Sequence, residues 1–197
     1  MAVYSIEGTQ DSCYPGTTVL INKLGIKTQV ELDTVEKQLV LLKSALIEQE
    51  GSFKNVSFAF YKKLHKELFC DLSDWAGCAR TISLSKKGTV FYRADDIERI
   101  GTLIFKRLDE MNYLKGIDRE HFACELAELY HDLNMLHPFR EGNGRTLRLF
   151  ITLLVRNAGF DICFAGCDSD ILMIATIKAA QGDLTLLRDV FSKLITE

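Results

Sequence analysis

Between residues 137 and 148 the chain brings together residue types that handle protons and phosphate groups. His137 opens this stretch, and because histidine titrates near neutrality it can take a proton from an attacking hydroxyl. Glu141 places a carboxylate in the same stretch, where it can hold a magnesium ion that bridges phosphate oxygens. The two residues predict a general base and a metal ligand in one loop.

The neighbouring residues favour binding of an anion. Gly142 and Gly144 flank Asn143 directly before a predicted helix, and glycines allow close approach to the free N–H groups of a helix N-terminus. Arg145 and Arg148 project from one side of that helix and oppose its dipole, a conflict that a polyphosphate would relieve. Each residue alone is more often a turn or surface residue. Together they predict a phosphate-binding catalytic loop and leave the identity of the transferred group open.

This loop is expected to join two central helices of a mostly helical domain. Apolar residues at steps of three and four predict the helices, and only two prolines interrupt the chain. Between Thr81 and Tyr92 the pattern changes to two short strands around a glycine turn, the only clear strand signal. The fold class is therefore mostly α, with a helix–loop–helix core and one small β-hairpin. The helices are predicted at about residues 28–49, 56–72, 94–111, 118–136, from the end of the loop to 157, 168–180 and 184–195.

Some side chains are expected in the core. Phe139 follows the rigid Pro138 and should anchor the loop rather than react, and Trp75 should be a core aromatic. In the first helix, Leu42 and Leu46 fall on the apolar side and should be buried.

The bulk properties are those of an ordinary globular protein. The 197 residues fit one domain, predicted at 28–197, after an irregular segment at 1–27. The net charge of −3 gives no reason to expect direct nucleic-acid or membrane binding, and neither a membrane span nor a secretory signal is recognisable. Six scattered cysteines without a CxxC pair favour reduced thiols in a cytoplasmic protein.

At the loop the sequence resembles the Fic (filamentation induced by cAMP) domain family, whose signature reads HPFx(D/E)GNGRxxR. Residues 137–148 match every specified position. A second match, residues 72–80, is similar to the DWAGxxR stretch that leads into the β-hairpin flap of the family, with Arg80 as its last residue. The resemblance extends from about residue 14 to residue 184, and it implies the Fic fold.

The resemblance also implies a protein adenylyltransferase that uses ATP and Mg²⁺. Glu141 would hold the metal, and Arg148 would contact the terminal phosphate. His137 would deprotonate a Tyr, Thr or Ser hydroxyl of a target protein, which then attacks the α-phosphate and releases pyrophosphate. The remaining phosphate contacts would come from Gly142, Asn143, Gly144 and Arg145.

The flap would align the target segment by strand-like backbone pairing, a general mode of peptide capture. Its target-binding residues would be Lys86, Gly88, Thr89, Val90, Phe91 and Tyr92.

The chain further resembles the short bacterial toxins of toxin–antitoxin pairs within this family. Many relatives carry an inhibitory helix, (S/T)xxxE(G/N), and residues 44–49 come nearest to it but depart at the last position. We expect Ser44 and Glu48 to be ordinary helix residues, and the inhibitor to be a separate small antitoxin protein that acts at Arg148. By the same resemblance, the targets would include the ATPase subunits of DNA gyrase and topoisomerase IV.

Three alternatives stay open at the level of sequence. The enzyme could transfer another phosphate-containing group, although the phosphorylating relative has different residues where Gly142 and Gly144 stand. It could be a secreted effector that modifies host proteins. It could also be a non-catalytic interaction module, against which the intact loop argues.

Overall fold

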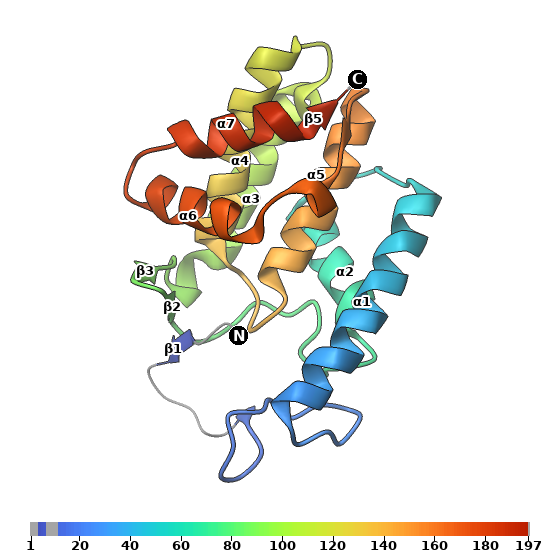
Figure 1. Ribbon diagram of the computed structural model, residues 1–197, viewed down its shortest axis with the longest axis vertical. Helices are drawn as coiled ribbons and strands as arrows, with labels where there is room; N and C mark the ends of the chain where they lie inside the picture. Colours follow the sequence, from blue (N-terminus) through green and yellow to red (C-terminus); the bar gives the residue numbers. More distant parts are fainter. Residues whose placement is uncertain (1–3, 7–11, 197) are drawn as a thin grey trace.

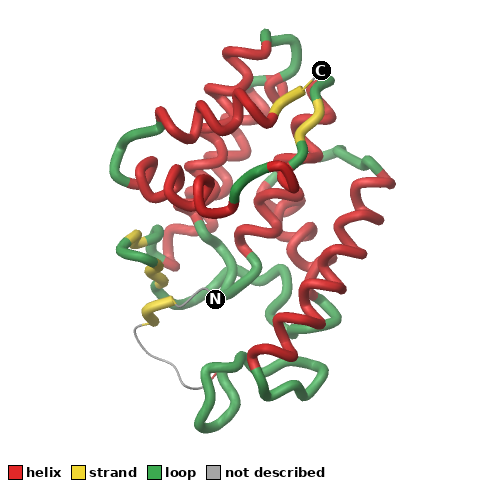
Figure 2. The backbone as a smooth tube through the Cα atoms, viewed as in Figure 1, coloured by secondary structure: helices red, strands yellow, loops and turns green. Residues whose placement is uncertain are grey.

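Helices dominate the computed structural model, which describes residues 4–6 and 12–196 (Figures 1 and 2). Residues 1–3 and 7–11 of the predicted N-terminal segment, and residue 197 of the predicted domain, lie outside the described residues. The predicted division of the chain at residue 27 stays a prediction. The main helices are α1 (Gln29–Glu50), α2 (Phe58–Phe69), α3 (Ile97–Glu110), α4 (Arg119–Leu136), α5 (Asn143–Ala158), α6 (Ser169–Ala180) and α7 (Thr185–Leu194).

The mostly α fold class is confirmed, and the predicted helices all form. The helix predicted at 94–111 begins with a short 3₁₀ turn, η2 (Ala94–Asp96), before α3. Further 3₁₀ turns occur at Asn112–Leu114 and Phe164–Gly166. Within the described ranges, no helix is long and apolar enough to cross a membrane.

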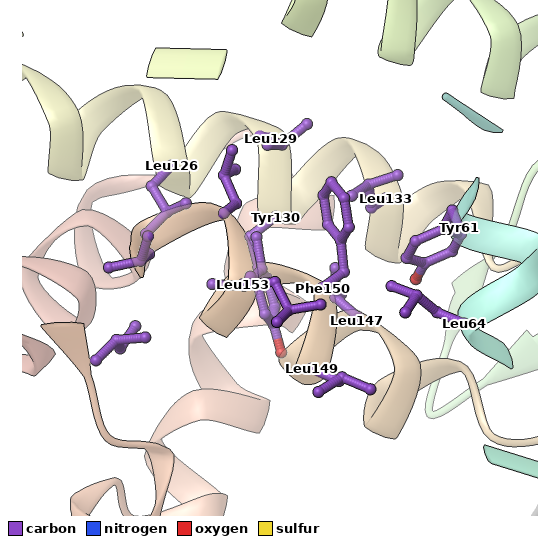
Figure 3. Packing of buried hydrophobic residues seen from close by; sticks show 14 of the residues in the cluster. Tyr61, Leu64, Leu126, Leu129, Tyr130, Leu133, Leu147, Leu149, Phe150 and Leu153 are labelled. Atoms are coloured by element: carbon purple, nitrogen blue, oxygen red, sulfur yellow. The ribbon is translucent and has the colours of Figure 1, made fainter. Parts of the chain in front are cut away.

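Helix α5 lies at the centre of the molecule and packs against α1, α2 and α4 (Figure 1). It is buried on almost all sides, with Leu147 at 2% exposure and Phe150 at 0%. Figure 3 shows the side chains of α4, among them Leu126 and Leu133, directed toward those of α5. Full burial of each such side chain stabilises the fold by roughly 1.5–3 kcal/mol. The loop that joins α4 and α5 is thus held between the two best-packed helices.

The strands are more numerous than predicted. The hairpin forms from β2 (Leu84–Lys86) and β3 (Thr89–Val90), and β1 (Tyr4–Ile6) pairs antiparallel with the other edge of β2. A second pair joins β4 (Asp161–Ile162) to β5 (Ile195–Thr196). The expectations of an irregular segment at 1–27 and of a single hairpin were therefore incomplete. Strands of two or three residues are too short to show the period-two alternation that reveals a strand in a sequence.

The predicted apolar side of α1 was wrong in part. Leu42 is 59% exposed and Leu46 is 51% exposed, whereas Leu32 and Val40 are the buried apolar residues. The inward face is centred on the line from Leu32 through Glu36 to Val40, at steps of four. Val35, Leu39 and Ile47, on the predicted side, are half-buried and pack against the core, so the apolar pattern located the inward face only in part because a charged residue stands in the middle of it.

Candidate active site

His137 ends α4 in a left-handed conformation, with φ 40° and ψ 57°. Its own N–H donates to the carbonyl of Leu133, which completes the last helical turn. The following Pro138 disfavours a helical conformation at residue 137, so the chain must leave the helix here. A left-handed non-glycine residue costs about 1 kcal/mol, and such strain concentrates at functional positions.

The contacts of the His137 imidazole fix which ring nitrogen carries the proton. Its Nδ1 lies 3.2 Å from the carbonyl oxygen of Asn134, and because a carbonyl can only accept, Nδ1 carries the proton and Nε2 the lone pair. The ring stacks on Phe91 with centroids 3.7 Å apart. Burial lowers the pKa of His137 to about 3, against the opposing effect of the Asn134 hydrogen bond, while Lys86 and Arg80 lower it further. The ring is therefore a neutral base at pH 7.

Arg80, the last residue of the second matching stretch, ties the hairpin to the loop. Its guanidinium is 4% exposed and donates to the carbonyls of His137 at 2.8 Å, Ile82 at 2.6 Å and Tyr92 at 2.5 Å. Its backbone N–H donates to the carbonyl of Pro138 at 2.8 Å. Because burial disfavours its charge, the pKa of Arg80 falls to about 10. One side chain thus links the segments on both sides of the hairpin to the backbone of His137.

Asn143 holds the loop from inside. It is 4% exposed; its Oδ1 accepts from the N–H of Phe139 and its Nδ2 donates to the carbonyl of Phe139, both at 2.8 Å. Phe139 is fully buried, as predicted for an anchor. The side chain of Asn143 therefore fixes the shape of the loop, and the predicted phosphate contact of Asn143 stays a prediction.

His65 supports the loop from α2, and sequence reasoning missed it. Its Nδ1 accepts the N–H of Gly77 at 2.8 Å, so its Nε2 carries the proton and donates to the carbonyl of Glu141 at 3.0 Å. The ring stacks on Phe139 at 3.7 Å, and burial lowers the pKa of His65 to about 4. Gly142 has φ 79°, and a Cβ there would lie 2.6 Å from the ring of Phe69. Glycine is required at this close approach.

The charged residues of the loop lie beside the N-terminus of α5. Arg145 pairs with Glu141 at 3.3 Å and with Glu36 of α1, and its guanidinium lies 5.1 Å from the ring centre of Phe69. The first turn of α5 holds no acidic residue to complement the helix dipole. This end of the helix therefore favours an anion.

Arg148 lies one turn further along α5. Its charge acts on the buried hydroxyl of Tyr130, whose pKa is raised to about 12 chiefly by burial. A Cβ on Gly144 would lie 3.4 Å from Nη1 of Arg148, so the guanidinium lies against the backbone of Gly144.

These groups share one cleft with a volume of about 850 Å³, which lies within the range of small-molecule sites. The predicted site residues on its walls are His137, Glu141, Gly144, Arg145, Arg148, Lys86, Thr89 and Phe91. Gly142 and Asn143 are buried and do not line it. Cleft residues that sequence reasoning did not assign include Glu36, Tyr130 and Arg140.

The residues of the hairpin face in different directions. Lys86 lines the cleft and is half-buried, and burial lowers its pKa. Phe91 is only 8% exposed and supports His137, whereas Val90 is 71% exposed and Tyr92 37% exposed. Gly88 forms the turn, with φ 81°. Phe91 was predicted to contact the target; its ring stacks on His137 and lines the cleft, and the predicted contact stays a prediction.

The donor set suits a metal ion that arrives with phosphates. Across the described part of the chain, no three His, Cys, Asp or Glu side chains are grouped to hold a metal by themselves. Magnesium is commonly held by one or two carboxylates together with substrate phosphates. Glu141, on the wall of the cleft beside the N-terminus of α5, fits that pattern.

Comparisons with known proteins agree with this geometry. The model of the Fic/DOC family matches residues 55–155. The chain is 32% identical to the "Probable protein adenylyltransferase Fic" of Escherichia coli, over 97% of this chain and 94% of that protein. It is 34% identical to the protein adenylyltransferase VbhT of Bartonella schoenbuchensis, over 97% of this chain and 40% of that longer protein.

Solved structures show the same fold. The BepC protein of Bartonella tribocorum, a VirB-translocated effector solved with bound AMPPNP, superposes with a TM-score of 0.88 at 29% identity. That match covers 94% of this chain and 96% of the BepC chain. A Fic domain of Bartonella quintana with bound ADP has the same TM-score at 28% identity, over 93% of this chain and 94% of that one.

Proposed function

The chain belongs to the Fic/DOC family and is a protein adenylyltransferase, and we propose that it transfers AMP from ATP to a tyrosine, threonine or serine hydroxyl of another protein. The observation that carries the proposal is the orientation of His137. Its Nδ1 donates to the carbonyl of Asn134, so Nε2 is the basic nitrogen of a ring that lines the cleft beside the anion-binding end of α5.

In this reaction the target hydroxyl gives its proton to Nε2 of His137. Its oxygen forms a bond to the α-phosphorus of ATP, and the bond from that phosphorus to the oxygen of the leaving pyrophosphate breaks. The negative charge of bound phosphates favours the protonated imidazole and so raises the pKa of His137 from its low value in the free chain. The base is thereby strengthened only when the substrate is present.

Binding of the polyphosphate falls to the loop and the start of α5. Arg145 and Arg148, together with the backbone N–H groups of Gly142, Asn143 and Gly144, would contact the phosphate oxygens, with Arg148 at the terminal phosphate. Glu141 would hold Mg²⁺, which when bound neutralises charge on the leaving pyrophosphate.

The target segment would bind along the hairpin as an added strand. Because β2 already has β1 and β3 as neighbours, the added strand would pair with the outer edge of β3. The exposed Val90 and Tyr92 lie near that edge and would contact the target. Lys86, which points to the cleft, would lie between the target and the phosphates.

The proposal includes external control. Glu48, the candidate inhibitory glutamate, accepts a hydrogen bond at 2.7 Å from Arg156, which lies eight residues beyond Arg148 on α5. Eight residues span about 12 Å of helix, so Glu48 is engaged away from the phosphate site. A separate small inhibitory protein acting at Arg148 would then restrain the enzyme. In a bacterial cytoplasm the targets of the enzyme would be the ATPase subunits of DNA gyrase and topoisomerase IV.

A second candidate function is modification of host proteins. It is favoured by the solved relatives, several of which are VirB-translocated effectors of Bartonella. Expression in bacteria separates the two candidates. Growth arrest with modified gyrase supports the toxin proposal, whereas modification confined to proteins of a eukaryotic lysate supports the effector.

The transferred group is tested with ATP labelled at different phosphates. The purified protein is incubated with Mg²⁺, a bacterial lysate and ATP labelled on either the α- or the γ-phosphate. We expect protein-bound label only from α-labelled ATP and, by mass spectrometry, a gain of one AMP. Label from the γ-phosphate, or a gain of phosphate alone, would overturn the proposal.

A further inference from the structure

A carboxylate stands on the buried face of α1 opposite the catalytic loop. Glu36 lies one helical turn from Leu32 on one side and from Val40 on the other, and both leucine and valine are buried. The side chain of Glu36 is 15% exposed. A carboxylate in such a position is costly unless it is paired, and its partner is Arg145.

Arg145 is shared between two carboxylates. It pairs with Glu36 from α1 and, at 3.3 Å, with Glu141 of the loop, while the ring of Phe69 lies on its guanidinium at 5.1 Å. The side chains of Arg145 and Glu141 are 28% and 29% exposed, so all three charges are screened less than surface charges. The contact to Glu36 uses Nη1 and the contact to Glu141 uses Nη2, so a single positive charge is divided between two carboxylates and neutralises each of them less.

This competition matters for Glu141 because a carboxylate paired with a guanidinium is a poorer ligand for a cation. We infer that Glu36 is a positioning residue: it holds one side of the Arg145 guanidinium toward α1, so that Arg145 neutralises Glu141 less and Glu141 binds Mg²⁺ more readily. The inference rests on the proposed function, since it takes Glu141 as the metal ligand and Arg145 as a phosphate contact. A residue of α1, a helix far from the loop in sequence, would then affect the Mg²⁺ dependence of the enzyme.

Two other roles for Glu36 predict different results. A purely structural clamp would change the stability of the protein and leave its Mg²⁺ dependence unchanged. A competitor of the phosphates would weaken nucleotide binding, so that its removal would tighten the binding of ATP.

The test measures nucleotide binding without turnover. Isothermal titration calorimetry with α,β-methylene-ATP, which cannot release AMP, gives the Mg²⁺ concentration at which binding is half-maximal. For Glu36→Gln we expect that concentration to rise roughly fivefold, the factor that a partly exposed charge pair carries. Glu36→Asp keeps the charge and should recover most of the difference. The matched control is Glu31→Gln, an exposed glutamate near the start of α1, which should behave as the unmodified protein.

A double-variant cycle shows whether Glu36 acts through Glu141. In a Glu141→Ala background, Glu36→Gln should leave the affinity for the analogue at fixed Mg²⁺ unchanged, because the competing carboxylate is gone. An unchanged Mg²⁺ requirement in Glu36→Gln, tighter analogue binding, or an equal effect with and without Glu141 would overturn the inference. If the unmodified protein transfers no AMP, the proposed function fails; if it transfers AMP and Glu36→Gln matches it in every readout, only the inference fails.

Discussion

Replacing Asn143 with alanine should destabilise the protein through the loop rather than through the helix that Asn143 begins. Its amide satisfies both the N–H and the carbonyl of Phe139 at 2.8 Å, in a place where Phe139 is fully buried. A buried backbone group that loses its partner costs about 1–3 kcal/mol. Two such groups give a loss of about 3 kcal/mol in the free energy of unfolding. For a chain of this size each kcal/mol shifts Tm by about 2–4 °C, so Tm should fall by about 6–12 °C.

The assay is urea denaturation followed by circular dichroism, with transfer of labelled AMP measured on the same preparations. Asn157→Ala, near the other end of α5, makes the same chemical change away from the loop and serves as the matched control. We expect the control to lie within about 0.5 kcal/mol of the unmodified protein. A loss below about 1 kcal/mol for Asn143→Ala, or equal losses in both variants, would refute the view that this side chain holds the loop.

Three further predictions concern the base, its support and regulation. In an unfolded chain the pKa of a histidine is about 6.5. Burial lowers the pKa of His65 to about 4 and that of His137 to about 3 in the folded chain. As the pH falls, the unfolded chain therefore binds protons before the folded chain does, and the folded chain becomes less stable. The free energy of unfolding should therefore drop by about 4 kcal/mol from pH 7 to pH 5, and a flat profile in urea denaturation would contradict this. Phe91→Ala removes the ring stacked on His137 and should lower kcat for AMP transfer about tenfold. Val90→Ala, at an exposed position of the hairpin, should instead change the KM for the target protein. Equal effects of the two variants on kcat would count against the stacking role of Phe91. Glu48→Ala should leave the basal rate of AMP transfer unchanged, and a marked rise would reveal inhibition within the chain.

The candidate residues of the loop could be recognised from the sequence because they are contiguous. Residues 137–148 carry a histidine, a glutamate, the glycines and the arginines within one stretch, so no tertiary information was needed to group them. The helices were predicted for a similar reason. Apolar residues at steps of three and four report the buried face of a helix wherever packing follows that face.

The supports of the loop could not be predicted in the same way. His65 and Glu141 are 76 positions apart, and Glu36 meets Arg145 only because α1 packs against α5. Nothing in a single sequence separates a half-buried glutamate from an exposed one. Asn143 shows the converse: its place between two glycines suggests a phosphate ligand, while its amide is used by the backbone of Phe139.

Transfer of α-labelled AMP by His137→Ala, compared with the unmodified protein, tests the central claim most directly. The matched control is His121→Ala, which replaces an exposed histidine on the same helix. Loss of a positioned general base typically costs a factor of about 100 to 10,000 in rate. We expect that loss for His137→Ala, with the affinity for α,β-methylene-ATP preserved and with His121→Ala fully active. Transfer by His137→Ala at a rate near that of the unmodified protein would contradict the assignment of His137 as the base.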